Sequence, residues 1–264
     1  TLSFKPSYLS IVSTLVKGEG KLLAAHVSET KSSYEEGDFE YTLKYYKPSF
    51  IVHGTYLRRR EFEILAEKKI PLVMCPRANT FFSVGVPQIA EAIKSGTTIS
   101  LGTDNAGWIL PNIWREVEYA FNLTRLQDRK IAEPKTFFKV ITYNAAKTLS
   151  LKREGVIDEG MKANITLLKP SANIVLTKNI LASIILRTDR RDVLEVLLEG
   201  KPLIEWIKWL GAGCGSPIFD RELPAVTINQ YGDGTAVYIS SELFRAYFES
   251  VSYTHLRAHE TSLH

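Results

Sequence analysis

The first 150 residues alternate between two spacings of apolar side chains. Short apolar runs end abruptly in polar or turn-forming residues, and longer segments between them carry apolar residues every three or four positions. The short runs predict buried strands, and the longer segments predict amphipathic helices. We expect strands at 21–25, 49–52, 70–74 and 98–101, and helices at 4–18, 33–47, 58–69, 87–95, 112–127 and 134–149.

This alternation of strands and helices predicts the fold class. Near-continuous apolar strands that recur every 20 to 30 residues or so favour parallel pairing with crossover helices. Four such units make half of an eight-stranded (β/α) barrel. We therefore expect an α/β fold with a partial TIM-type barrel over residues 1–150.

The pattern changes after residue 150. A turn-rich stretch at 155–160 and short apolar runs at 164–169 and 193–198 indicate a small β appendage over 151–204. Beyond it we expect an irregular tail: 205–250 is a segment of uncertain origin, expected to be mis-joined, and 251–264 a non-native end that looks like translated sequencing adapter. Within this tail the pattern predicts a strand pair at 226–229 and 236–239 and a helix at 242–248.

Composition excludes several classes of protein. The 264 residues are 45% hydrophobic with a formal charge of +4, and the arginines cluster only at 58–60 and 187–191, so no nucleic-acid-binding stripe is expected. No apolar run reaches the roughly 20 residues that a membrane span requires, so we expect no membrane partner. Two cysteines, Cys75 and Cys214, rule out a disulfide framework and favour a reducing, cytoplasmic compartment.

Candidate chemistry gathers where the predicted strands end. His26 ends the first strand with Glu29 three residues later, His53 ends the second, and Asp104 follows the fourth. The carboxyl ends of parallel strands share one rim, which is where a (β/α) barrel does its chemistry. A zinc or iron ion held there would lower the pKa of bound water from ~15.7 to about 7. Glu29 could then take the proton and return it to a leaving nitrogen.

Several of these residues have alternative explanations. His53 either ligates the metal or polarises the attacking water, and Asp104 either ligates the metal or caps the following helix. Cys75 is better explained as a packing residue at a strand end than as a ligand. Arg77 and Asn79 are expected substrate contacts at the same rim.

A second group of histidines lies near the end of the chain. His255 and His259 have the i, i+4 spacing of two helical ligands, and His264 follows them. No glutamate stands between them in the order that metalloproteases use, and the segment lacks a core pattern. We expect no metal site there.

Four short motifs resemble the amidohydrolase superfamily, specifically its chlorohydrolase and nucleoside or nucleobase deaminase branch. HVSET, VHGTYL, CPRAN and LGTDN look like the motifs of the family's barrel strands five to eight, in the same order. Residues 141–170 are similar to its barrel-closing helix and return to a β-sandwich, and 183–202 resemble the final strands of that sandwich. The resemblance covers about residues 1–204.

The resemblance implies specific roles. His26 and Asp104 would be metal ligands, Glu29 the proton shuttle, and His53 a group that aligns the metal-bound hydroxide. The cofactor would be one divalent metal, zinc first and iron as the alternative. The substrate would be a small heterocyclic molecule, and the parent protein a homodimer.

The implied reaction is hydrolytic deamination or dechlorination of a heteroaromatic ring. Methylthioadenosine or adenosylhomocysteine is the nearest specific substrate, with aminofutalosine, guanine and cytosine as alternatives. The family's other two ligands come from an HxH motif that this sequence lacks. The chain as given is therefore expected to be a nearly inactive fragment.

Two other functions stay open. A non-catalytic amidohydrolase-like barrel used for assembly or binding would also lack the HxH motif. Residues 209–228 faintly resemble the opening strands of metallo-β-lactamase-fold nucleases, although their histidine-rich motif is missing.

Overall fold

The structure is a computed structural model that describes residues 3–169, 178–203, 226–231 and 234–239. The chain divides into two compact units. The larger contains Thr1–Lys162 and Leu168–Leu194, and the smaller contains Ala163–Leu167 and Glu195–His264. Among the described residues, no helix combines the length and apolar character needed to cross a bilayer.

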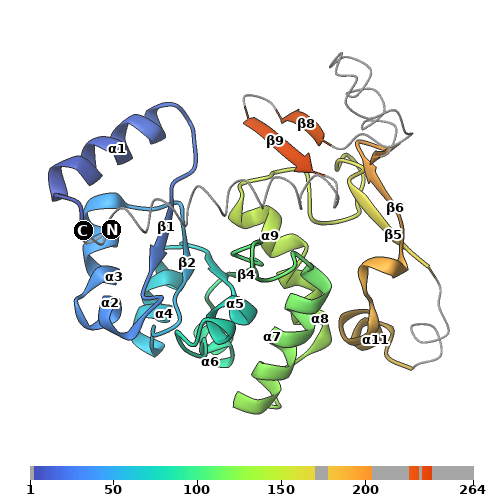
Figure 1. Cartoon of the computed structure of the whole chain (residues 1–264), viewed down its shortest axis with the longest axis horizontal. Helices are drawn as coiled ribbons and strands as arrows, with labels where there is room; N and C mark the ends of the chain where they lie inside the picture. Colours follow the sequence, from blue (N-terminus) through green and yellow to red (C-terminus); the bar gives the residue numbers. More distant parts are fainter. Residues whose placement is uncertain (1–2, 170–177, 204–225, 232–233, 240–264) are drawn as a thin grey trace, which may run out of the picture. The chain divides into compact units, whose positions relative to one another are not determined.

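Four parallel strands form the centre of the larger unit, as the sequence predicted. Their order in the sheet is β1-β2-β3-β4, and Figure 1 labels β1, β2 and β4. The register places Val27 opposite His53, and Met74 opposite Leu101. The strands span Ala24–Val27 (β1), Phe50–His53 (β2), Leu72–Met74 (β3) and Ile99–Leu101 (β4). The α/β class with a parallel sheet is thus confirmed.

Four predicted helices lie close to their expected positions. Pro6 occupies the first turn of α1, where its missing N–H leaves no bond unmade. The side chain of Asn112 caps α7 by accepting hydrogen bonds from the N–H groups of Trp114 and Arg115. The four helices span Pro6–Gly18 (α1), Arg59–Glu67 (α4), Ile89–Lys94 (α6) and Ile113–Gln127 (α7).

The single helix expected at 33–47 is wrong, because three short elements occupy this stretch. Gly37 adopts a left-handed conformation with φ of 76°, which ends one helix and starts the next in a new direction. The elements are α2 (Lys31–Glu35), α3 (Asp38–Tyr41) and the π-helix η1 (Thr42–Tyr46).

The helix expected at 134–149 is also divided in two. Thr142 leaves the helical conformation with φ of −123° and ψ of −92°, and its hydroxyl donates to the carbonyl of Phe138. β-Branched side chains that bond back to their own backbone disfavour a continuous helix. The two helices are α8 (Pro134–Val140) and α9 (Tyr143–Thr148), and the unexpected short α5 spans Pro76–Phe81.

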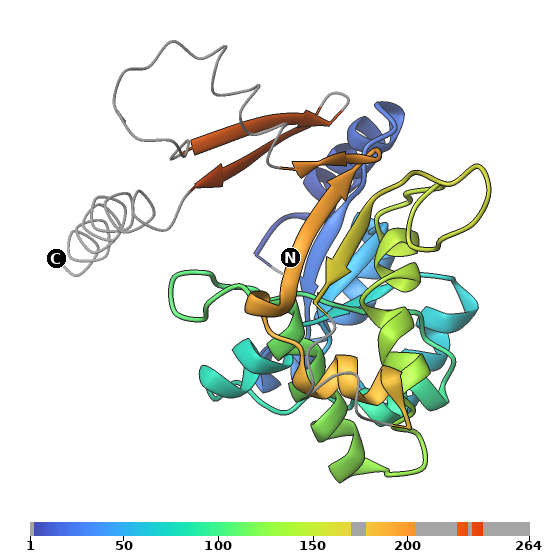
Figure 2. The same cartoon turned by 90° about the vertical axis from the view of Figure 1, so that its right-hand side faces the viewer.

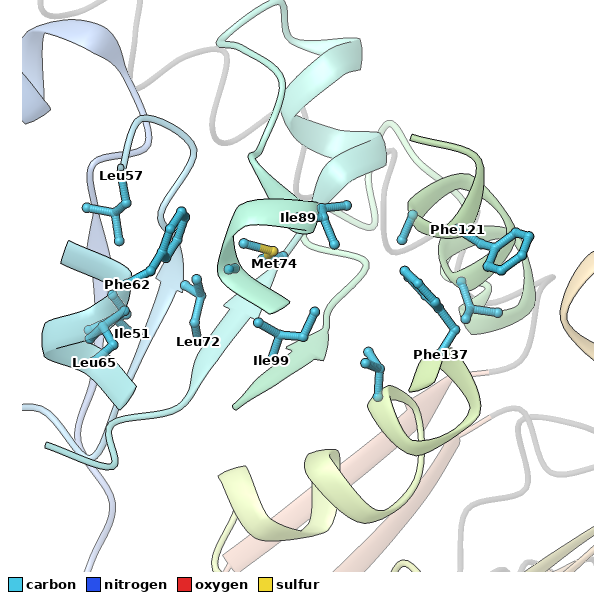
Figure 3. Packing of buried hydrophobic residues seen from close by; sticks show 14 of the residues in the cluster. Ile51, Leu57, Phe62, Leu65, Leu72, Met74, Ile89, Ile99, Phe121 and Phe137 are labelled. Atoms are coloured by element: carbon cyan, nitrogen blue, oxygen red, sulfur yellow. The ribbon is translucent and has the colours of Figure 1, made fainter. Parts of the chain in front are cut away.

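The core lies between the sheet and its helices. Along β2 and β3, Ile51, Leu72 and Met74 are fully buried, whereas the intervening Val52 and Val73 are only partly buried. Figure 3 shows one continuous row of apolar side chains running from α4 past the strands to α7 and α8. The labelled members are Ile51, Leu57, Phe62, Leu65, Leu72, Met74, Ile89, Ile99, Phe121 and Phe137.

Residues 183–187 correct one expectation. They resembled a sandwich strand, but they belong to a helix, because apolar residues recur there with helical spacing and Asn179 caps its start by accepting from the N–H of Ala182. The strands expected at 164–169 and 193–198 are present within a three-stranded sheet of order β5-β6-β7. The elements are β5 (Ile165–Leu168), α11 (Ile180–Arg187), η2 (Arg190–Asp192), β6 (Val193–Leu198) and β7 (Lys201–Pro202).

The strand pair expected in the tail is confirmed. Strands β8 (Val226–Tyr231) and β9 (Gly234–Ile239) run antiparallel, as Figure 2 shows. The expected helix at 242–248 and the expected non-native end at 251–264 lie outside the described residues.

We expect that replacing Phe137 by Ala lowers the free energy of unfolding by about 3–5 kcal/mol. Phe137 is fully buried, and its ring meets that of Phe121 edge-on at 5.3 Å. Urea denaturation measures the change. Phe81→Ala is the matched control, because Phe81 is 57% exposed and its loss should change the free energy by at most about 0.5 kcal/mol. Equal losses in both variants would contradict this account of the core.

Candidate metal centre

Three residues at the carboxyl edge of the sheet share an unusual backbone conformation. Ser28, His53 and Asp104 have φ values of 48°, 73° and 56°. Left-handed conformations are unfavourable for residues with a Cβ, and they concentrate where a protein holds functional groups in place. At each position the chain turns sharply out of its strand, and the strand's polar side chains remain at the rim.

The structure brings His26, Glu29 and His53 together. His53 Nε2 lies 3.0 Å from His26 Nδ1 and 3.6 Å from Glu29 Oε2. One ligand atom from each of the three residues lies within 4.8 Å of the others. The pairing of β1 with β2 places His26 opposite Val52, next to His53, and the left-handed backbone at His53 ends the strand where the two rings meet.

A second group overlaps the first. Ligand atoms of His53, Cys75 and Asp104 also lie within 4.8 Å of one another. His53 belongs to both groups and therefore lies close to both His26 and Asp104. Cys75 is buried, and burial followed by the charge of Asp104 raises the pKa of its thiol far above the usual range, so the thiol stays protonated and behaves as a packing residue.

Asn79 fixes the orientation of the His53 ring. Its side-chain Nδ2 lies 3.2 Å from His53 Nδ1, and both side chains are 1% exposed. With Asn79 donating to Nδ1, the neutral ring carries its proton on Nε2, which faces His26 and Glu29. Burial lowers the pKa of His53, and the charge of Glu29 opposes that shift. The expected contact of Asn79 with substrate stays a prediction.

Arg77 lies in α5, two residues before Asn79, and is held by a buried acid. Its backbone N–H donates to Glu116 Oε1 at 3.0 Å, and its Nη1 lies 3.6 Å from Glu116 Oε2. Glu116 is fully buried, and burial raises its pKa from 4.5 to about 7. The guanidinium of Arg77 borders a cavity of about 570 Å³ whose other polar walls include Asn112 and Tyr119.

Sequence reasoning missed two buried acids near the rim, Glu116 and Asp38. Asp38 accepts two hydrogen bonds of 2.6 Å from Ser28, one from its N–H and one from its hydroxyl. Burial raises the pKa of Asp38, and these two bonds oppose the shift. Neither acid lies in a motif, and helix periodicity gives no signal for an acid that faces inward.

The donor set fits a divalent cation of the zinc type. Imidazole nitrogens and carboxylate oxygens are its usual ligands, and a catalytic site keeps a position open for water. The direct contact between two imidazole nitrogens means that both rings point at one place, as the ligands and water-aligning groups of a single ion do. His26 and Asp104 are exposed, so an ion and its substrate could reach them.

The sequence profile of the amidohydrolase family matches residues 1–203. The chain belongs to this family. It is 36% identical over 195 residues to an uncharacterized protein of Methanocaldococcus jannaschii. The alignment covers 69% of this chain and 48% of that protein. It is also 30% identical over 212 residues to a 5-methylthioadenosine/S-adenosylhomocysteine deaminase of Thermococcus sibiricus. That alignment covers 74% of this chain and 49% of the deaminase.

Solved amidohydrolase-like structures share the fold. A zinc-bound adenosine deaminase from Xanthomonas campestris superposes with a TM-score of 0.67 at 20% identity, covering 75% of this chain and 48% of that one. Guanine deaminase from Escherichia coli gives a TM-score of 0.66 at 19% identity, covering 75% and 52%. The chain thus spans about half the length of the relatives it matches.

We expect Glu116 to make the stability of the fold depend on pH. Because its pKa rises from 4.5 in the unfolded chain to about 7 in the fold, the folded state binds an extra proton between these values. Its stabilisation is fully present below pH 4.5 and is lost as pH rises through 7, a difference on the order of 3 kcal/mol.

Urea denaturation of the wild type and Glu116→Gln between pH 4.5 and 8 measures this contribution. The glutamine keeps an oxygen to accept the N–H of Arg77 but cannot ionise. The variant should gain stability relative to the wild type as the pH rises. A constant difference across the range would show that Glu116 does not titrate there.

Proposed function

We propose that this sequence forms the catalytic rim of a metal-dependent hydrolase that deaminates a nucleoside or nucleobase-like ring. The observation that carries the proposal is the convergence of His26, Glu29, His53 and Asp104 in two overlapping groups at one strand edge. Membership of the amidohydrolase family and the similarity to relatives named as deaminases favour hydrolysis of a carbon–nitrogen bond.

Each residue has a distinct role in the proposal. His26 and Asp104 hold one divalent metal, with zinc favoured because a structural neighbour carries it. The metal supplies a water acidic enough to act near neutral pH. His53 lies close to both ligands, and its Nε2 is 3.0 Å from His26 Nδ1. From there its Nε2 proton would align the attacking oxygen by donating a hydrogen bond.

Glu29 serves as the proton carrier. Its side chain is about one-third exposed and its Oε2 lies 3.6 Å from His53 Nε2, so it can reach both the centre and a molecule above it. A carboxylate there accepts the proton of the attacking water and delivers it to the ring nitrogen or to the leaving amine. The amine departs as ammonia and the ring gains a carbonyl.

The substrate is a small heterocyclic molecule in this proposal. Arg77 offers a guanidinium at the edge of the 570 Å³ cavity, which is lined by none of the residues of the two candidate metal groups. Asn79, two residues further along α5, acts through its bond to His53. The carbonyl and nitrogen acceptors of a purine or pyrimidine would pair with such donors. The ring identity among methylthioadenosine, adenosylhomocysteine, aminofutalosine, guanine and cytosine is left to experiment.

The remaining architecture follows the relatives. Residues 1–150 correspond to strands five to eight of an eight-stranded barrel, and 151–204 to part of a β-sandwich. Because the chain spans about half of its relatives and contains no HxH motif, the full ligand set and homodimeric assembly belong to a protein of the relatives' length. Activity is therefore proposed for such a protein.

We expect Glu29→Gln to abolish deamination without loss of metal. The test protein is a hybrid in which the amino-terminal half of a curated relative precedes residues 1–203. Ammonia release is measured with the five candidate rings, and zinc content by atomic absorption. The amide cannot carry the proton, so kcat should fall by about 10²–10⁴-fold with zinc content unchanged.

Glu63→Gln is the matched control, because Glu63 is exposed on α4 and pairs with Arg59 on the same helix. It should leave both ammonia release and zinc content intact. Full activity in Glu29→Gln would sink the assignment. A folded, zinc-loaded hybrid that releases no ammonia from any of the rings would instead favour the non-catalytic barrel.

A further inference from the structure

The turn that joins His26 to Glu29 is held by a residue outside the candidate metal centre. Ser28 is fully buried and adopts a φ of 48°, a conformation that costs a non-glycine residue about 1 kcal/mol or more. His26 lies two residues before it and Glu29 directly after it. The backbone of Ser28 therefore decides where both candidate side chains point, and something must hold it in place.

Asp38 supplies that hold. It is 4% exposed at the start of α3, and its carboxylate accepts from both donors of Ser28: Oδ2 from the N–H and Oδ1 from the hydroxyl, each at 2.6 Å. Hydrogen bonds to an ionised acceptor are short and strong. Two bonds from one rigid carboxylate to one residue fix its orientation as well as its position.

Ser28 is also hydrogen-bonded to the turn that follows β2. The carbonyl of Ser28 accepts from the N–H of Tyr56 at 3.1 Å, and the carbonyl of Val27 accepts from the N–H of Gly54 at 3.0 Å. Tyr56 and Gly54 belong to the turn that follows His53. The turn after β1 and the turn after β2 are thus bonded to each other through Ser28.

The break in the helix at Gly37 makes this contact possible. A continuous helix over 33–47 would direct residue 38 according to the helical repeat, whereas the left-handed Gly37 restarts the chain with Asp38 facing the sheet. A carboxylate is suited to this position because it only accepts, and Ser28 presents two donors.

We propose that Asp38 is a positioning residue, which through Ser28 holds His26 and Glu29 in register with His53. The two hydrogen bonds of Asp38 described above go to Ser28 and not to these three side chains. Asp38 therefore acts on them through the turn. A purely structural role would lower stability and leave the candidate centre unchanged in the molecules that remain folded. The two roles can therefore be separated by experiment.

The test uses the 264-residue chain with ¹⁵N-labelled histidine. Ring-nitrogen spectra report the contact between His26 Nδ1 and His53 Nε2, and His26→Gln and His53→Gln assign the signals. In folded Asp38→Ala, we expect both rings to move toward the shifts of free neutral imidazole. We also expect zinc affinity, measured with a competing chelator, to fall by about 10–100-fold.

Two variants grade the effect. Asp38→Asn keeps one acceptor for the Ser28 N–H and can donate to the hydroxyl, so it should restore the ring signals and keep zinc affinity within about threefold of the wild type. Ser28→Ala removes only the hydroxyl bond and should give an intermediate change. If Asp38→Ala does not fold, the same measurements on Asp38→Asn and Ser28→Ala test the proposal.

Thr97→Val controls for a general loss of stability. The Thr97 hydroxyl is buried and donates to the carbonyl of Phe62 at 2.8 Å, at the opposite end of the strands. Its removal should lower the melting temperature and leave the ring signals and zinc affinity unchanged.

The outcomes separate this inference from the proposed function, on which only the zinc measurement rests. Unchanged ring signals and zinc affinity in a folded Asp38→Ala would overturn the positioning role and leave the proposed metal centre standing. Ring signals that depend on Asp38 in a chain that binds no zinc would support the positioning role, and the zinc content of the hybrid would then decide the proposed metal centre.

Discussion

The pairing of β1 with β2 is the constraint on which the candidate centre depends. In the parallel register, His26 lies opposite Val52, and Val27 opposite His53. Shifting this register by one residue would turn every side chain of one strand to the other face of the sheet. In the observed register the two histidines stand at adjacent, not paired, positions, and His53, at the end of β2 where its backbone is left-handed, meets His26 at 3.0 Å. A shifted register would change this spacing and the contact would be lost.

Two separate features hold that register. On the helix-facing side, Ala25, Val27 and Ile51 are buried in the apolar core, so a shift would expose apolar surface and bury polar groups. At the rim, the Gly54 N–H donates to the Val27 carbonyl and joins the ends of the two strands, and Ser28 donates to Asp38, which fixes the turn after β1. The hydrophobic effect thus selects the register, and the polar bonds set the positions within it.

The sequence was sufficient for the parts that depend on periodicity and strand ends. Apolar runs that stop at His26, His53 and Asp104 predicted the parallel sheet and placed three side chains at one edge. The helix breaks at Gly37 and Thr142 were missed, because apolar spacing continues across them and only backbone conformation reveals the change of direction. Motif spacing carries no information about which distant acid faces inward, so the bond between Asp38 and Ser28 could not be predicted.

The rim carries polar groups that lower the stability of the fold. Asn79 Oδ1 and Glu116 Oε2 are buried without a hydrogen-bond partner, and each unmade bond costs about 1–3 kcal/mol. The left-handed backbone at His53 adds to this cost. Among the described residues, buried oxygens of Thr55, Ser95 and Thr188 also lack a hydrogen-bond partner. At His53 the left-handed backbone and the buried amide of Asn79 coincide in one bonded pair. Such a pair is better explained by selection for a site than by selection for stability, because apolar packing alone would replace it.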